Sequence, residues 1–432
     1  MKKLFTPALL LALLLGIGLT SCLEDRCDIT RTYVAWEPVY VGENEIRQAI
    51  ETEGPRQLEE PGKIYYYQNY LLITERGEGI HVIENSDPEN PTPVSFINIP
   101  GNNDMAVRGD YLYADNYIDL VVIDISNPEA PKYEGRTEDV FPFYTLYNDL
   151  GYLIDYVETE KTEVISCNSP HWDQDFFFRD DIIFVDQAFD FSNSEVLRPH
   201  TSNSNGNGAV TVGVGGSMAR FTITGSYLYT VDDSSLDVFD LGNATQPSLA
   251  TTVQLPWGIE TIFPYGSNLF IGANNGMHIY DNSNPLSPQH LSTFAHVQSC
   301  DPVFVNGDIA YVTLRDGNAC QGFVNQLDVV DVSDLSNPFL LKTYPMHHPH
   351  GLSISEDHLY LCEGDQGLKV FDIEDWQTID QNLKAHLTGF TTFDIITIGS
   401  RKLAMVIGQA GLRQFDISDP ANPKELSILA PK

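Results

Sequence analysis

The sequence has 432 residues, of which 60 are Asp or Glu and 24 are Lys or Arg, giving a formal net charge of −36 at pH 7. Such an acidic surface repels phosphate backbones, which excludes nucleic acid as a partner and favours cations, basic proteins or neutral sugars. The same charge also suits the solubility of an exported protein. The chain is long for one ordinary domain, although repeat architectures reach this length.

Residues 1–21 have the pattern of an export signal. Lys2 and Lys3 precede an apolar stretch, Leu9–Leu19, that is too short to span a bilayer. The Leu-Thr-Ser-Cys sequence at 19–22 resembles a bacterial lipobox. This resemblance implies cleavage before Cys22 and lipid attachment to Cys22, which would anchor the protein to a membrane. An ordinary cleaved signal or a lone anchor helix is the alternative.

The residues after Cys22 indicate where the protein is located. Leu23 is not the aspartate that retains some lipoproteins in an inner membrane, and Glu24 and Asp25 resemble the acidic tether of surface lipoproteins of Bacteroidetes. We therefore expect the outer membrane or the cell surface.

Residues 22–60 are interpreted as a lipidated tether followed by a short ordered segment. Tyr33–Val41 has strand character, and Pro38 places that strand at a sheet edge because proline cannot donate to a ladder. Glu43–Ile50 is expected to form one or two helical turns.

One pattern recurs eight times along the rest of the chain. In LVVIDISNPEAP (120–131) an apolar run predicts a buried strand. Asp124, Ser126, Asn127 and Pro128 end that strand in a turn, because their side chains bond nearby backbone and proline cannot donate. The other copies occupy residues 80–91, 162–170, 236–247, 277–288, 327–338, 368–376 and 412–423. The copy at 162–170 is weak, with Ser166 in place of the acid.

Another predicted strand precedes each copy. The central residues of these strands are Leu71, Leu112, Leu153, Leu228, Leu269, Ala310, Leu359 and Leu403, and most of them are 41 residues apart. The long step from Leu153 to Leu228 contains an insert at residues 171–215. Four strands fit one period, and in the second repeat they are 105–107, 111–115, 120–125 and 132–136.

Four short strands repeated at this spacing are the signature of a β-propeller. We predict an all-β fold in which residues 61–432 form one propeller of four-stranded blades. Eight blades are expected, with seven as the alternative if the third repeat packs elsewhere. Aromatic side chains should fill the space between blades: Tyr65–Tyr67, Tyr111, Tyr113, Tyr227, Tyr229, Phe239, Phe371 and Phe415.

The repeats resemble the LVIVD repeats of bacterial and archaeal propeller proteins over roughly residues 63–432. With the lipobox included, the chain is similar to LVIVD-repeat lipoproteins of Bacteroidetes. The third repeat departs from the pattern by lacking the acid, and the seventh has Glu374-Asp375-Trp376 in place of Ser-Asn-Pro. The resemblance implies a fold and a location, since the family has no general activity.

The loops of a propeller lie on two faces. Turns between third and fourth strands, with their Ser-Asn-Pro sequences, share one face with the turns between first and second strands; we call this the Ser-Asn-Pro face. The other face carries the segments that lead into the first strands and the turns between second and third strands. These loops differ in length and sequence, so we call it the variable face and expect function there. Neutral drift in loop length is the alternative.

Residues just before the first strands should form a polar, mainly acidic ring at the channel mouth on the variable face. Such a ring could bind a cation or polar ligand groups, or hold only ordered water. No cofactor is expected. The ligand-binding candidates are residues of this ring together with two nearby histidines and one tryptophan: Asn103, Asp104, Trp257, Glu260, Asp301, His348, His350 and Asp394.

His348 and His350 are also weak metal candidates. They are two residues apart, so in an extended segment they project to one side, where Asp301 or Asp394 could complete a transition-metal site. A surface histidine cluster is the simpler interpretation, and pH sensing is a third.

Two cysteines of the sixth repeat are predicted to pair. Cys300 precedes its first strand and Cys320 lies in its second-to-third turn, and export permits disulfides. Cys167 occupies an apolar strand position and is expected to be a buried thiol.

Searches for catalytic motifs find no GxSxG elbow, P-loop, HExxH or dinucleotide fingerprint. We therefore predict a lipid-anchored envelope scaffold that binds a glycan or a partner protein on its variable face. One alternative is a carbohydrate-active enzyme using acids such as Glu260 and Asp301. Another is a purely structural envelope protein.

Overall fold

A computed structural model describes residues 28–48, 50–141, 144–166, 214–215, 219–297, 302–316 and 324–432. Their regular secondary structure is almost entirely strand, with one helical turn, α2 (Glu43–Ile46), and the 3₁₀ turns η2 (Ile379–Gln381) and η3 (Gly399–Arg401). No helix among them has the length and apolar character needed to cross a membrane. The chain divides into two compact units, residues 1–40 with 153–186 and residues 41–152 with 187–432.

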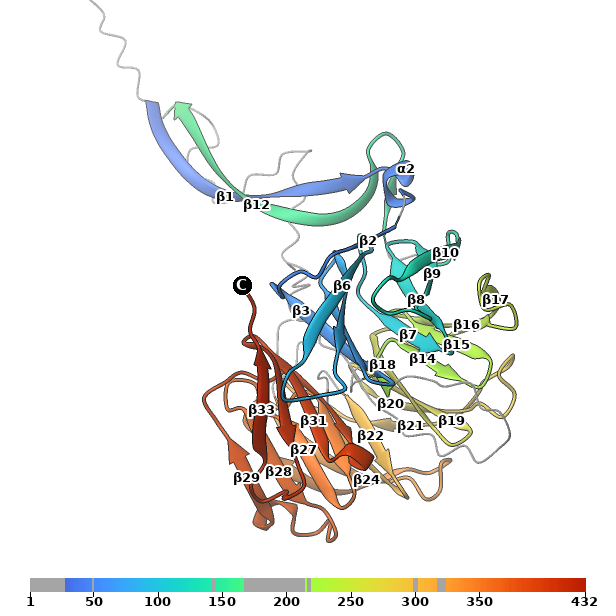
Figure 1. Cartoon of the computed structure of the whole chain (residues 1–432), viewed down its shortest axis with the longest axis vertical. Coiled ribbons are helices and arrows are strands. Elements are labelled where there is room, and N and C mark those ends of the chain that lie inside the picture. Colours follow the sequence, from blue (N-terminus) through green and yellow to red (C-terminus); the bar gives the residue numbers. More distant parts are fainter. Residues whose placement is uncertain are drawn as a thin grey trace, which may run out of the picture. The chain divides into compact units, whose positions relative to one another are not determined.

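The larger unit is built from antiparallel sheets whose strands follow chain order (Figure 1). The first sheet has β3 (Pro61–Tyr67), β4 (Tyr70–Glu75), β5 (Gly79–Glu84) and β6 (Thr92–Asn98) at its centre. Two short strands extend it to six: β13 (Val214–Gly215) pairs with β3, and β2 (Glu51–Glu53) pairs with β6. Two residues of the predicted insert thus occupy the edge of the strand expected to line the channel.

Six further sheets have four strands each. The second comprises β7 (Met105–Arg108), β8 (Tyr111–Asn116), β9 (Asp119–Asp124) and β10 (Lys132–Thr137). Then come β14 (Phe221–Thr224), β15 (Tyr227–Val231), β16 (Ser235–Asp240) and β17 (Ser248–Gln254), followed by β18 (Ile259–Tyr265), β19 (Asn268–Ala273), β20 (Gly276–Asp281) and β21 (Gln289–Ala295).

The last three sheets continue the same order. They comprise β22 (Val303–Asn306), β23 (Ile309–Leu314), β24 (Gln326–Asp331) and β25 (Phe339–Pro345); β26 (Leu352–Ser355), β27 (His358–Cys362), β28 (Leu368–Asp372) and β29 (Leu383–Leu387); and β30 (Asp394–Ile398), β31 (Leu403–Gly408), β32 (Gly411–Asp416) and β33 (Lys424–Leu429). The fourth strand of the last sheet, β33, comes from the C-terminal end of the chain itself.

The repeated apolar run forms the third strand of each of these sheets. In β9 the first five residues are buried, whereas the fourth strand of a sheet, such as β17, is mostly exposed. A run buried on both faces needs no alternation of polar and apolar residues, since each face packs against a neighbouring sheet. This packing explains why the sequence of the third strand is a continuous apolar stretch.

Apolar clusters join the sheets of the described residues into a closed ring. Each of seven clusters combines side chains of two sheets, and following them in order leads from the first sheet through the seventh and back to the first. The sheet β30–β33 accordingly lies beside β3–β6 (Figure 1). The predicted β-propeller of four-stranded sheets is confirmed, and the predicted aromatics lie in or against these clusters.

The eight repeats correspond to eight sheets, but seven of these sheets form the ring. The eighth has three strands, β1 (Asp28–Val41), β12 (Gly151–Ser166) and β11 (Leu146–Tyr147), and contributes to none of the seven clusters. The eight sheets agree with the eight predicted repeats, and among the residues that the structure describes the clusters join seven of these sheets. The ring closes directly between the second and fourth repeats, where the Phe141 and Phe221 rings lie 5.6 Å apart.

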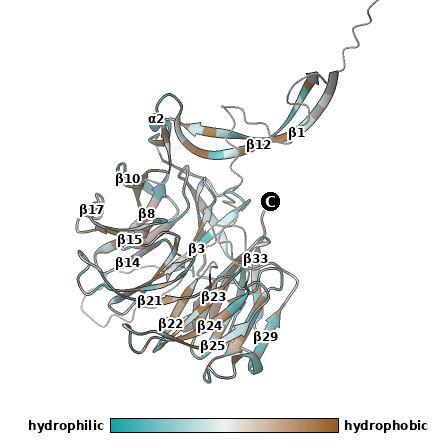
Figure 2. Ribbon diagram, turned by 180° about the vertical axis from the view of Figure 1, so that it is seen from behind, coloured by the Kyte–Doolittle hydropathy of each residue, from teal (hydrophilic) through white to brown (hydrophobic). Residues whose placement is uncertain are grey.

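The third repeat differs because its second and third strands merge. Residues 156–163 contain no Gly, Pro or Asn, so nothing breaks the chain into a turn, and β12 continues for 16 residues. Its partner β1 contains the predicted strand Tyr33–Val41. Figure 2 shows hydrophobic and hydrophilic residues interleaved along both strands, and Val34 and Trp36 are exposed.

The turns on the Ser-Asn-Pro face follow the predicted mechanism. Asp124 Oδ1 accepts a hydrogen bond of 2.7 Å from the Ser126 amide. In each of the other ring sheets, the acid at the end of the third strand likewise accepts a hydrogen bond from the backbone amide two residues further along. On the variable face, incoming segments bond the second-to-third turns: Gly258 N donates to Asp233 O at 2.7 Å.

Candidate functional site

On the variable face, carboxylates hold the segments that lead into the first strands. In three sheets a buried acid within one residue of the end of the second strand accepts two consecutive backbone N–H groups of its own incoming segment. These acids are Glu75, Asp115 and Glu363, and each is at most 4% exposed. Sequence reasoning missed them, although each follows the second-strand leucine by three or four residues.

Two of these acids also pair with a base six residues further along. Glu75 Oε2 lies 2.7 Å from His81 Nε2, and Glu363 Oε1 accepts a bond of 3.0 Å from Lys369 Nζ. Burial would raise the pKa of Glu75, but His81 and the amides of Glu59 and Glu60 hold it below its ordinary value. Glu75 is therefore held as a carboxylate within the fold.

Asp115 has a different environment. Its Oδ1 accepts bonds of 2.8 Å from the Asn103 and Asp104 amides and from Asn102 Nδ2. Burial raises the pKa of Asp115 to about 6, against the lowering effect of those amides, with Asp104 adding a second negative charge. Asn103 Nδ2 bonds Asp115 Oδ2 at 3.3 Å, so this ligand candidate orients an acid.

Asp104, predicted as a ligand contact, bridges three sheets. Its Oδ2 accepts a bond of 2.6 Å from Lys63 Nζ in β3 and bonds of 2.7 and 3.2 Å from the amides of Arg220 and Phe221 at the start of β14. Its Oδ1 accepts the Met105 amide at 2.7 Å. Both side chains of the ion pair are 5% exposed, and burial lowers the pKa of Lys63 despite the attraction of Asp104. This contact links the second repeat directly to the fourth.

The remaining candidates are spread around the variable face. Trp257 is 71% exposed, Glu260 is half-buried in β18, and Asp394 is buried at the start of β30. Phe393, next to Asp394, has its ring 5.8 Å from the ring of His350. The structure thus brings Asn103 and Asp104 together, and His350 near Asp394, while Trp257 stands out into solvent.

His348 and His350 do meet, as predicted. His350 Nε2 lies 2.9 Å from His348 Nδ1, and His348 Nε2 lies 3.4 Å from Asp316 Oδ1. Gly364 makes room for the pair, because a Cβ there would come within 3.0 Å of both facing nitrogens. Among the described residues no group of three or more His, Cys, Asp or Glu side chains is arranged to hold a metal ion.

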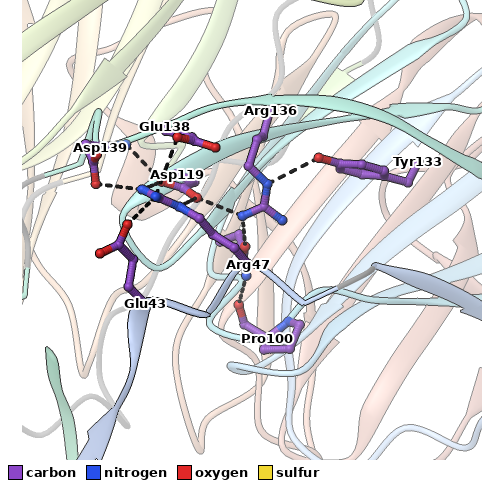
Figure 3. Close-up of polar contacts among 9 residues, drawn as sticks. Glu43, Arg47, Pro100, Asp119, Tyr133, Arg136, Glu138 and Asp139 are labelled. Carbon is purple, nitrogen blue, oxygen red and sulfur yellow. Dashed lines mark hydrogen bonds and ion pairs between the residues drawn. The ribbon is translucent and has the colours of Figure 1, made fainter. Parts of the chain in front are cut away.

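A cluster of charges fastens the segment before β3 to the second sheet (Figure 3). Arg47, just after α2, donates to Asp119 Oδ2 at 3.0 Å and to Asp139 Oδ1 at 2.8 Å. Arg136 donates to the same Asp119 Oδ2 at 2.7 Å. The Asp119 side chain has no exposed surface, and these bonds keep its pKa below the ordinary value although burial opposes them.

A polar pocket of about 460 Å³ lies on the variable face of the first sheet. Its walls come from the segment before β3, the end of β4 with the turn to β5, β5 itself, and Lys432 after β33. Sequence reasoning did not find it, because among the lining residues only His81 lies in the repeated pattern, and the other lining segments meet it through contacts that no local pattern encodes. The lining residues are Arg56, Gln57, Glu59, Glu75, Glu78, His81 and Lys432.

Several predictions fall outside the described residues. These concern the lipid site Cys22, the ligand candidate Asp301, the pair Cys300 and Cys320, the thiol Cys167, and the insert apart from β13. They remain predictions.

Comparison with known proteins supports the repeat assignment and the fold. Residues 102–139, 215–254 and 299–345 each match the LVIVD repeat. No curated protein matches the chain. Among solved structures, the periplasmic gluconolactonase PpgL of Pseudomonas aeruginosa is 11% identical, with a TM-score of 0.52 over 86% of this chain and 96% of that one.

Two further structures are more distant in shape. A functionally unknown protein from Desulfotomaculum acetoxidans is 12% identical, with a TM-score of 0.49 over 86% of this chain and all of that one. BamB from Moraxella catarrhalis is 7% identical, with a TM-score of 0.47 over 89% of this chain and 97% of that one. At these identities the likeness concerns the fold alone.

Proposed function

From the premise of a β-propeller that carries LVIVD repeats, we propose that the protein is a lipid-anchored scaffold of the cell envelope. It binds a glycan or a partner protein on its variable face. The N-terminal pattern ending at Cys22 supports the anchor, and the acidic tether supports the outer membrane or cell surface.

The observation that carries the binding role is the way in which acids are used on the variable face. Asp104, Asp115 and Glu363 are buried and accept backbone amides, so they make the loops rigid. Binding surfaces usually consist of loops of unequal length that a rigid scaffold holds in place. Asp104 has donors on both oxygens, which favours a structural role for this acid over proton transfer.

The exposed Trp257 tests this binding role. An exposed indole is a typical anchor at a protein or sugar interface, and its loss costs about 2 kcal/mol or more, which is about 30-fold in affinity. The protein should be used as bait on intact envelopes, and we expect Trp257→Ala to lose the retained ligand. Leu286→Ala is the matched control, because Leu286 is 49% exposed on the Ser-Asn-Pro face of the same sheet.

If wild-type bait retains neither glycan nor protein, the binding role is refuted and a structural envelope role replaces it. Equal loss in both variants would remove the variable face from the proposal. The anchor is tested separately: Cys22→Ser should move the protein from the membrane fraction to the soluble fraction and abolish incorporation of labelled fatty acid. Retention of label by this variant would contradict the lipobox assignment.

A further inference from the structure

The pocket on the first sheet has the features of a small-ligand site. Its volume of about 460 Å³ lies within the range of about 300–1,000 Å³ that is usual for such sites. It contains a buried acid–imidazole pair, since the Glu75 and His81 side chains are 5% and 2% exposed. A buried pair of this kind at a pocket wall is costly unless it is well satisfied, and here it is.

The lining side chains are held in place by contacts with one another and with residues behind the pocket wall. Glu75 orients the His81 imidazole and accepts the Glu59 amide at 3.1 Å. Arg56 has its guanidinium 4.1 Å from the centre of the Phe96 ring and bonds Glu53 Oε2 at 2.8 Å. Donors and acceptors held in this way are preorganised for a ligand.

The opposite wall is equally constrained. Lys432 Nζ donates to Glu59 Oε1 at 2.9 Å, and the Lys432 amide donates to Leu58 O at 2.8 Å. Arg56 NH1 donates to Glu78 Oε2 at 3.0 Å across the rim.

The charges of the lining select against ionic ligands. Arg56 and Lys432 are each already paired with a carboxylate of the pocket, and Glu75 adds a third carboxylate. An anion would approach three carboxylates, and a cation would have to displace a base from its partner. A neutral molecule with many hydroxyl groups meets neither penalty, because each hydroxyl both donates and accepts.

We propose that this pocket binds a neutral saccharide unit, whose hydroxyls donate to Glu59 and Glu78 and accept from Arg56, Gln57 and Lys432. The His81 imidazole, oriented by Glu75, supplies a further polar contact. Every lining side chain carries a polar or charged group, which matches a ligand rich in hydroxyl groups. This inference rests on the proposed function, since it assigns one ligand class to one place on the variable face.

Saturation-transfer NMR and calorimetry on the full mature protein test the ligand class. The neutral probes are D-glucose, D-galactose and N-acetyl-D-glucosamine. Glucuronate, galacturonate and glucosamine are their respective charged counterparts. We expect saturable binding of at least one neutral sugar and at least about tenfold weaker binding of its charged counterpart. Absence of binding by every neutral sugar, or equal binding of a charged one, would overturn the proposal.

Rim variants test the place. Gln57→Ala removes a donor and an acceptor from the pocket, and Glu78→Gln replaces a carboxylate acceptor by an NH₂ donor; each should weaken sugar binding by about tenfold. Glu89→Gln is the matched control, with the same charge change at an exposed position on the Ser-Asn-Pro face of the same sheet. Sugar binding that survives both rim variants would refute this pocket. If no sugar binds while envelope bait still retains a Trp257-dependent partner, this inference fails and the proposed function stands.

Discussion

The ion pair between Lys63 and Asp104 offers the sharpest test of how the ring is closed. Asp104 Oδ2 receives the Lys63 ammonium at 2.6 Å and two amides of the fourth repeat. Asp104→Ala would leave a buried ammonium and three amides without their acceptor. Lys63→Met keeps the length of the side chain and leaves a carboxylate that still has three N–H donors.

These differences set the expected magnitudes. Removing one partner of a buried ion pair lowers the free energy of unfolding by about 3–5 kcal/mol. We expect a loss of about 3 kcal/mol for Lys63→Met and of about 5 kcal/mol for Asp104→Ala. The double variant buries no unpaired charge and should cost about 5, giving a coupling energy of about 3 kcal/mol. By contrast, Lys402→Met breaks a pair whose side chains are 39% and 65% exposed, and should cost less than about 1 kcal/mol.

The assay is equilibrium unfolding in urea of the four variants and the wild type, followed by tryptophan fluorescence. The reasoning is refuted if Asp104→Ala costs no more than Lys402→Met, or if the effects of the two single substitutions simply add.

Three further predictions concern individual positions. Because burial raises the pKa of Asp115 to about 6 from an ordinary 3.8, its stabilising contribution is complete below the unfolded pKa and is lost as pH rises through the folded pKa. Asp115→Asn has no group that titrates there. Its free energy of unfolding should therefore rise by about 2 kcal/mol relative to that of the wild type between about pH 4.5 and about pH 7.5. A difference in free energy of unfolding that does not depend on pH would contradict the raised pKa of Asp115. Gly79→Ala should destabilise the protein by about 3 kcal/mol or more, because φ is +147° and a Cβ would come 2.0 Å from Ile97 O. Gly77→Ala, at φ +66° in open space, should cost about 1–2 kcal/mol, and the same unfolding assay compares the two. Peptide mapping without reductant should find Cys300 linked to Cys320, and both cysteines recovered as thiols would refute that pairing.

Local signals in the sequence were sufficient for most of the fold. The apolar run and Asp124 predict a strand and the turn that follows it, because both depend on residues within a few positions. Repetition then supplies the architecture, since an isolated four-stranded sheet cannot bury both faces.

The third repeat shows where this reasoning stopped. Leu153 and the apolar residues near Ser166 keep the repeat count at eight, but turn residues are missing between the two strands. Pairing with β1 joins segments more than a hundred residues apart, and no local pattern encodes such a pairing. The absence of Gly, Pro and Asn from residues 156–163 was the available signal.

The candidate site shows a similar division. Periodicity placed Asn103 and Asp104 correctly at the start of a first strand, but the amides of Arg220 and Phe221 that bind Asp104 come from a distant repeat. The pocket around Glu75 and His81 depends on contacts with residues 56–59 and with Lys432, and the repeat pattern at 80–91 does not encode these contacts.

A short cross-link between the second and fourth repeats tests the central claim most directly. Arg108 and Ser226 belong to neighbouring sheets of the ring, and their side chains bond at 3.2 Å. In an Arg108→Cys/Ser226→Cys variant, we predict efficient cross-linking by a short bismaleimide, with the linked peptides identified by mass spectrometry. An eighth blade between these repeats would add a sheet spacing of about 10 Å, and failure of the cross-link would contradict the direct closure of the ring.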